Sequence, residues 1–108
     1  MVTMFWSYRV ADWDAWAAAM QEEESRLRQR REKYGMVRRY VYRSVDDPNE
    51  VMLVAEFRTR EGAEGLLRDP DGMRSWNERT GLEVFPPVIL GEEQAHLRYS
   101  LEALPQRT

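Results

Sequence analysis

Two strand–helix–strand units of nearly equal length fill most of this chain, and their order limits the possible folds more than any other feature of the sequence. Alternating apolar residues predict strands, and apolar residues at helical spacing predict helices. In chain order the predicted elements are a strand over 4–10, a helix over 13–34, strands over 37–43 and 51–57, a helix over 60–67 that resumes at 73–79, and a strand over 88–90. This βαββαβ order predicts an α+β, ferredoxin-like fold: a four-stranded antiparallel sheet with helices on one face.

Both predicted helices carry suitable residues at their ends. Asp12 and Thr59 are placed as N-cap residues, whose side-chain oxygens accept hydrogen bonds from free N–H groups of the first turn. Gly35 stands where a left-handed residue would end the first helix. Gly62 and Gly65 fall inside the second helix. We interpret them as tolerated there, the alternative being that another backbone or a ligand comes close.

The segment 37–57 is predicted to be a hairpin, because turn-forming residues at 45–50 separate its strands. The register predicted from charge and aromatic matches pairs Arg43 with Val51, Arg38 with Glu56 and Val37 with Phe57. It also gathers large apolar side chains on the face without helices: Tyr40, Tyr42, Met52 and Val54. A bare apolar face predicts that a second copy covers it, so we expect a homodimer.

The composition is that of one ordinary globular domain. The 108 residues carry a net charge of −3, which gives no reason to expect nucleic acid as a partner. The chain has no cysteine, which excludes disulfides, thiolate metal sites and cysteine nucleophiles. The single histidine, His96, has no second ligand at metal-binding spacing, so we expect no metal site. We expect a domain over 1–93, a tail over 94–108, no membrane partner and a cytoplasmic location.

Beyond this pattern, several short sequence motifs match a known group of proteins. They are Asp12-Trp13-Asp14-Ala15-Trp16, Tyr42-Arg43-Ser44 and Asp46-Asp47-Pro48-Asn49-Glu50-Val51. With the strand order and length, they resemble the dimeric α+β barrel superfamily, and within it the small bacterial antibiotic-biosynthesis monooxygenase and cyclase-like proteins. The resemblance covers about residues 3–92.

The resemblance implies that two sheets pack face to face as a barrel and that each ligand cleft lies between a subunit's own sheet and helices. The superfamily includes cofactor-free oxygenases of polyketide-like phenols, polyketide cyclases and haem-degrading enzymes. In the oxygenases an asparagine and a tryptophan on the third strand position the phenol, and the matching positions here are Leu53 and Phe57. Haem degraders need a histidine on the second helix, and residues 73–77 contain none, so we expect no cofactor.

Arg39 is the foremost candidate for binding a ligand. The predicted register sends its guanidinium toward the helices, where an unpaired cation would be costly. It therefore needs an anion. A substrate carboxylate or enolate is the functional alternative, and a salt bridge to Glu23 or Glu24 of the first helix is the structural one.

Other candidate substrate-binding residues are aromatic or polar. Trp6 and Tyr8 are placed to sandwich a flat ligand, with core or dimer packing as the alternative. Trp76 and Asn77 follow the break in the second helix and form a candidate lid. One predicted function is a cofactor-free oxygenase or cyclase acting on an aromatic or polyketide-like molecule. The alternative is a non-catalytic small-molecule-binding or structural homodimer. An open apolar cavity with Arg39, Trp6 or Trp76 on its wall favours the first. A cleft closed by Trp13, Trp16 and Phe57 favours the second.

Overall fold

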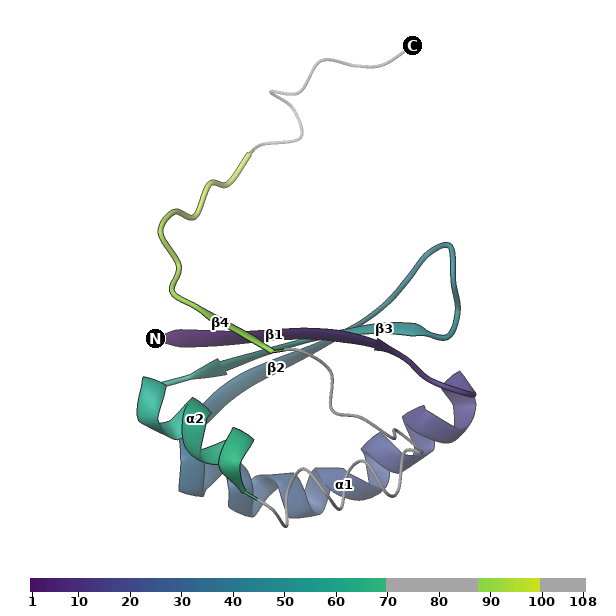
Figure 1. Cartoon of the computed structure of the whole chain (residues 1–108), viewed down its shortest axis with the longest axis horizontal. Coiled ribbons are helices and arrows are strands. Elements are labelled where there is room, and N and C mark those ends of the chain that lie inside the picture. Colours follow the sequence, from purple (N-terminus) through teal and green to yellow (C-terminus); the bar gives the residue numbers. More distant parts are fainter. Residues whose placement is uncertain (70–87, 100–108) are drawn as a thin grey trace.

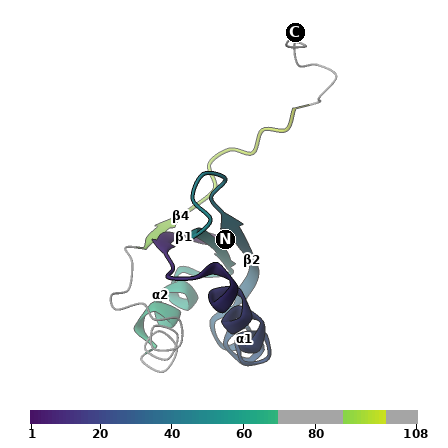
Figure 2. The ribbon, with the colours of Figure 1, turned by 90° about the vertical axis from the view of Figure 1, so that its right-hand side faces the viewer.

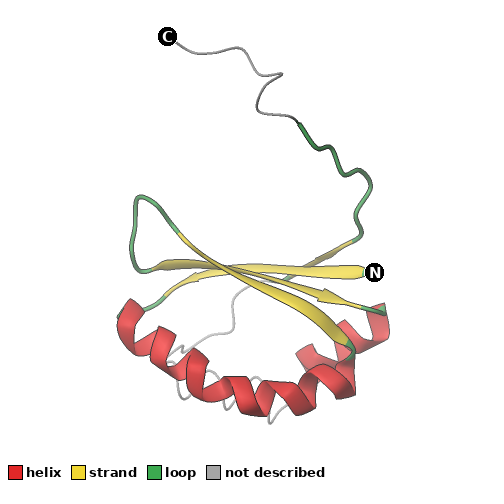
Figure 3. Ribbon diagram, turned by 180° about the vertical axis from the view of Figure 1, so that it is seen from behind, coloured by secondary structure: helices red, strands yellow, loops and turns green. Residues whose placement is uncertain are grey.

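A four-stranded antiparallel sheet carries the helices on one of its faces (Figure 1, Figure 3). The computed structural model describes residues 1–69 and 88–99. The elements are β1 (Val2–Arg9), α1 (Trp13–Tyr34), β2 (Met36–Arg43), β3 (Glu50–Phe57), α2 (Arg60–Arg68) and β4 (Ile89–Gly91). The strand order is β2-β3-β1-β4, with each neighbouring pair antiparallel. The predicted ferredoxin-like α+β fold is confirmed.

The helix caps lie where the sequence predicts them. The Asp12 side chain accepts a hydrogen bond from the Ala15 N–H at 3.2 Å, and Thr59 Oγ1 accepts one from the Gly62 N–H at 3.1 Å. Gly35 ends α1 with φ at 69°, the left-handed region that a residue with a Cβ adopts at a cost. These local interactions fix where each helix begins or ends.

The predicted hairpin register is confirmed along most of its length and is wrong at its start. The structure pairs Arg43 with Val51 and continues in step to Arg38 opposite Glu56, but then a β-bulge places Met36 opposite Phe57. The bulge leaves Val37 without the predicted partner, and that side chain is 40% exposed. The physical reason is packing. Met36 packs against the core cluster that contains the fully buried Phe57, and one extra residue in β2 turns it toward that cluster.

The core lies between the sheet and the helices in two adjoining clusters. One cluster joins β1, β3 and α2: Val2, Met4, Ala55, Phe57, Ala63 and Leu66. The other joins β1, β3 and α1: Val10, Trp16, Met20, Val51 and Leu53. Trp6 packs against both clusters, so it connects them beneath the middle of the sheet.

Gly62 and Gly65 allow α2 to approach the end of α1 closely. A Cβ added to Gly62 would stand 2.1 Å from the Tyr34 carbonyl oxygen, and one added to Gly65 would stand 3.0 Å from the Tyr34 ring. The interpretation that Gly62 is merely tolerated is therefore wrong, because another backbone comes close there, whereas Gly65 faces a side-chain ring. The Tyr34 hydroxyl also donates a hydrogen bond to Asp69, which raises the pKa of Tyr34 above its ordinary value.

Several predictions concern the later part of the chain. The resumed helix over 73–79, with Trp76 and Asn77, lies outside the described residues. The fourth strand is one residue later than predicted, at Ile89–Gly91. Within residues 1–69 and 88–99, neither helix combines the length and the apolar character needed to cross a bilayer. The cytoplasmic location and the domain boundary at 93 stay predictions.

Candidate functional site

The side of the sheet that faces the helices carries a hydrogen-bonded pair of aromatic residues. Trp16 Nε1, from α1, donates a hydrogen bond of 2.9 Å to the Tyr8 hydroxyl oxygen, from β1. The rings meet edge to face, with centroids 6.2 Å apart and planes at 68°. Trp16 is buried and Tyr8 is half-buried, so the pair holds the Tyr8 hydroxyl in a fixed position between sheet and helix.

A second aromatic side chain extends this pair toward the β2–β3 hairpin. The Trp13 ring lies 5.3 Å from the Trp16 ring, and the Arg43 guanidinium lies 4.6 Å from the centroid of Trp13, within cation–π range. Asn49 Oδ1 accepts a hydrogen bond of 3.3 Å from the backbone N–H of Trp13. Sequence reasoning missed the roles of Arg43 and Asn49, because it treated them as strand and turn residues without a view of what the hairpin contacts.

Trp6, Leu53 and Phe57 lie on the inner face with the core. Trp6 is paired with Leu53 across β1 and β3. Leu53 is 3% exposed and Phe57 is fully buried, so their present packing is that of core residues, while Trp6 is half-buried. Trp16 and Phe57 are therefore both buried within the core of the described residues.

Arg39 is held by an anion of the same chain. Its Nη2 lies 3.0 Å from Glu24 Oε2, and Arg31 Nη1 approaches the other oxygen of Glu24 at 3.5 Å. The Arg39 side chain is only 20% exposed, and burial lowers the pKa of its guanidinium below the ordinary value, against the opposing effect of Glu24. Of the two predicted salt-bridge partners the structure identifies Glu24, and the side chain of Glu23 is not among those described.

A small hollow of about 200 Å³ adjoins this ion pair. It is lined by Glu24, Arg31, Met36, Val37, Arg38, Arg39 and Val41. Its wall thus includes the two guanidinium groups that share one carboxylate. A carboxylate between two arginines leaves one positive charge uncompensated within the group.

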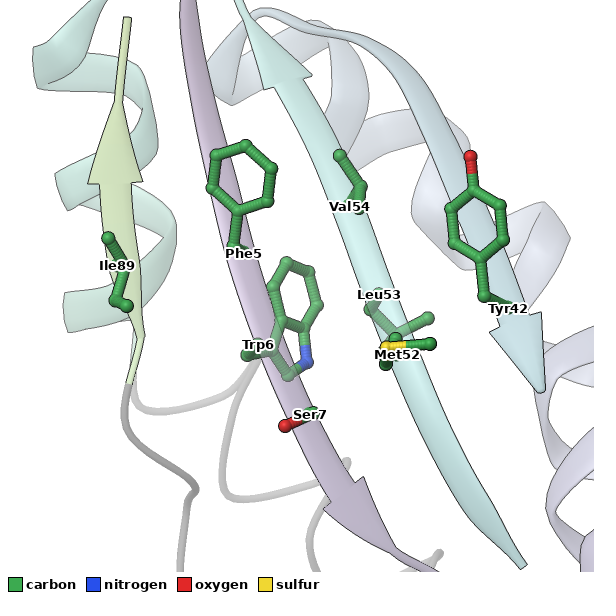
Figure 4. A pocket seen from close by; sticks show the side chains of 8 residues that line it. All are labelled: Phe5, Trp6, Ser7, Tyr42, Met52, Leu53, Val54 and Ile89. Carbon is green, nitrogen blue, oxygen red and sulfur yellow. The ribbon is translucent and has the colours of Figure 1, made fainter. Parts of the chain in front are cut away.

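A larger hollow, of about 640 Å³, lies on the opposite face of the sheet, which carries no helix and which we call the outer face (Figure 4). It is lined by Phe5, Ser7, Tyr42, Met52, Val54 and Ile89, and also by Trp6 and Leu53, although those two residues pack with the core on the inner face. Four of the side chains around it are widely exposed: Phe5 at 44%, Tyr42 at 50%, Met52 at 43% and Ile89 at 67%. The predicted apolar face thus exists, and it is hollowed at its centre.

The described residues offer little for binding a metal. Within residues 1–69 and 88–99, no three histidine, cysteine, aspartate or glutamate side chains gather closely enough to hold an ion. His96 is exposed, and its Nδ1 lies 3.0 Å from Glu93 Oε1.

Comparison with known proteins extends this description. The sequence matches no protein-family model and no curated protein. Among solved structures it is similar to SnoaB, a cofactor-independent oxygenase from Streptomyces nogalater, with a TM-score of 0.72 at 14% identity over 91% of this chain and 97% of that one. It is equally similar to a monooxygenase from the gene ActVA-Orf6 of Streptomyces coelicolor in complex with nanaomycin D, with a TM-score of 0.72 at 12% identity over 92% of each chain.

A third solved structure, an antibiotic biosynthesis monooxygenase, has a TM-score of 0.67 at 12% identity and covers 88% of this chain and 100% of that one. At such low identity the likeness concerns the backbone arrangement, since fold alone does not carry a reaction with it. The chain therefore has the ferredoxin-like α+β fold of the antibiotic biosynthesis monooxygenase-like proteins, as its short sequence phrases predict.

Proposed function

We propose that this protein is a homodimer that binds a flat aromatic or polyketide-like molecule and promotes its oxygenation or cyclisation without a cofactor. The observation that supports it best is the Tyr8 hydroxyl, which Trp16 Nε1 holds by a hydrogen bond of 2.9 Å on the face of the sheet that carries the helices. The fold supports it too, because one similar structure is a cofactor-independent oxygenase and another holds nanaomycin D.

The chemistry follows from the groups on this face. Trp6 and Tyr8 offer ring surfaces against which a flat molecule can stack. A phenol or enol that loses its proton becomes an anion, and a guanidinium in a poorly solvated site stabilises that anion. Arg39 supplies this cation once the ligand's oxygen shares it with Glu24 or replaces that carboxylate. Trp76 and Asn77 remain proposed lid residues.

The alternative is a homodimer that binds a small molecule without turnover or has a purely structural role. Two observations favour it. Glu24 already pairs with Arg39 at 3.0 Å, and Leu53 and Phe57 offer no hydrogen-bonding group at the positions matched to the oxygenases. In this alternative Arg39 contributes to stability by holding α1 against β2.

Replacing Arg39 with methionine distinguishes between a ligand-binding and a structural role for this residue. If Arg39 anchors an anionic or phenolic ligand, R39M should weaken binding by about 1.5–3 kcal/mol, the usual contribution of a hydrogen bond to a charged group. Thermal shift of the wild-type and variant proteins against a panel of hydroxyaromatic acids and polyketide fragments measures both ligand response and stability.

Arg38→Met is a matched control, since Arg38 is the next residue of β2, pairs with Glu56 at 2.9 Å and is 60% exposed. It should leave the ligand responses unchanged. A lower melting temperature for R39M with unchanged ligand responses would support the structural role instead. If R39M changed neither the melting temperature nor the ligand responses, Arg39 would not be part of the ligand-binding site.

A further inference from the structure

The hollow of about 200 Å³ that adjoins the Arg39 ion pair, which we call the edge hollow, lies at one edge of the sheet. β2 is an edge strand, and α1 lies beneath it on the side that carries the helices (Figure 2). Arg31 of α1 and Arg39 of β2 both line the hollow, and Glu24 of α1 contacts both of them. Helix and strand thus bring two guanidinium groups to one small cavity.

The charges around the edge hollow are not balanced by the described residues. Arg38 pairs with Glu56 at 2.9 Å, and Arg39 donates a hydrogen bond of 3.0 Å to Glu24. Arg31 Nη1 lies 3.5 Å from Glu24, and within residues 1–69 and 88–99 Arg31 makes no shorter ion pair or hydrogen bond. Its guanidinium therefore keeps N–H donors for another acceptor, and one positive charge is left over.

The rest of the wall of the edge hollow is apolar. Val37 and Val41 are 40% and 41% exposed, and Met36 is half-buried. A hydrocarbon group placed against these side chains would remove apolar surface from water. The volume lies below the range of about 300–1,000 Å³ that is usual for drug-sized ligands. The hollow therefore suits a molecule with a single ring or a short chain.

We propose that the edge hollow binds a small monocarboxylic acid. Its carboxylate accepts hydrogen bonds from Arg31 and Arg39, and its hydrocarbon part rests against Val37 and Val41. One added carboxylate balances the remaining positive charge, so Glu24 can keep its place. Inorganic phosphate fits less well, because it brings more negative charge and leaves the apolar wall in water. The inference goes beyond the proposed function, from which it takes only Arg39.

Titration calorimetry with sodium benzoate and with benzamide tests this site. The two probes share one ring, and only benzoate carries a charge. We expect benzoate to bind at millimolar concentrations, and benzamide to bind at least about tenfold more weakly. Arg31→Gln should weaken benzoate binding by about tenfold or more for the same reason. Arg28→Gln is the matched control, because it removes the same charge from an exposed position of α1 that does not line the hollow, and it should leave the affinity unchanged.

Glu24→Gln distinguishes a binding site from an ion cluster with a purely structural role. The variant removes the charge that competes with the ligand, so benzoate affinity should rise by about three- to tenfold. Glu24 is 57% exposed, so we expect the variant to stay folded. Benzoate should then raise the melting temperature of Glu24→Gln more than that of the wild-type protein. A structural cluster would instead give a lower melting temperature and no response to benzoate.

Several results would overturn the inference. They are equal binding of benzoate and benzamide, no binding of benzoate at millimolar concentrations, an unchanged affinity of Arg31→Gln, and weaker binding to Glu24→Gln. The proposed function is tested separately with polyketide fragments. If those fragments failed to bind and benzoate bound as expected, the proposed function alone would be wrong. If the fragments bound and benzoate did not, the edge hollow alone would lose its ligand.

Discussion

Replacing Gly62 with alanine is expected to destabilise the folded chain by about 1–3 kcal/mol, the usual cost of overpacking a well-filled site. The added Cβ would stand 2.1 Å from the Tyr34 carbonyl oxygen and 3.2 Å from Thr59 Oγ1. The carbonyl belongs to the backbone at the end of α1, so it moves only if the two helices separate. Urea unfolding followed by circular dichroism measures the change.

The sign of this effect makes the test decisive. Alanine in place of glycine inside a helix normally stabilises by about 1 kcal/mol, so a loss at Gly62 identifies a tertiary contact. Gly91→Ala is the control, because its added Cβ would meet the Phe5 ring at an ordinary 3.6 Å. The loss of stability for Gly65→Ala should lie between those for Gly62→Ala and Gly91→Ala, since the Tyr34 ring at 3.0 Å is a side chain that can shift. Greater stability of Gly62→Ala would show that α1 and α2 are not packed this closely.

Sequence reasoning predicted the fold well because its signals are local. Asp12 and Thr59 cap their helices through hydrogen bonds to residues three positions away, and such contacts are visible in the sequence. The hairpin register follows from adjacent pairs such as Arg38 with Glu56. The bulge before Arg38 was not predicted, because it depends on which residue reaches the core beside Phe57, a contact between elements.

The candidate site was harder to predict for the same reason. Alternation in β1 shows that Tyr8 faces the helices, but it does not show that the indole of Trp16 meets its hydroxyl. Glu24 could be named as a partner of Arg39 only as one of two neighbouring glutamates, because the rotation of α1 against the sheet decides between them. Arg43 and Asn49 were missed, since their contacts with Trp13 require the hairpin to fold over the start of α1.

Glutamate in place of Met52 is expected to dissociate the proposed homodimer. Met52 lies on the central strand β3, lines the outer-face hollow and is 43% exposed in the single chain, so the monomer can keep a charged side chain there in water. In a two-fold interface both subunits would bring this carboxylate into the contact. Each of the two carboxylates would lose its hydration without gaining a positively charged partner. We expect a loss of at least about 3 kcal/mol, which raises the dissociation constant more than a hundredfold.

Sedimentation equilibrium of M52E at micromolar concentration should therefore detect a monomer whose circular dichroism spectrum matches that of the wild-type protein. Val45→Glu adds the same charge in the β2–β3 loop, where the side chain is 98% exposed, and should leave the dimer intact. An intact M52E dimer would mean that the outer face is not the interface.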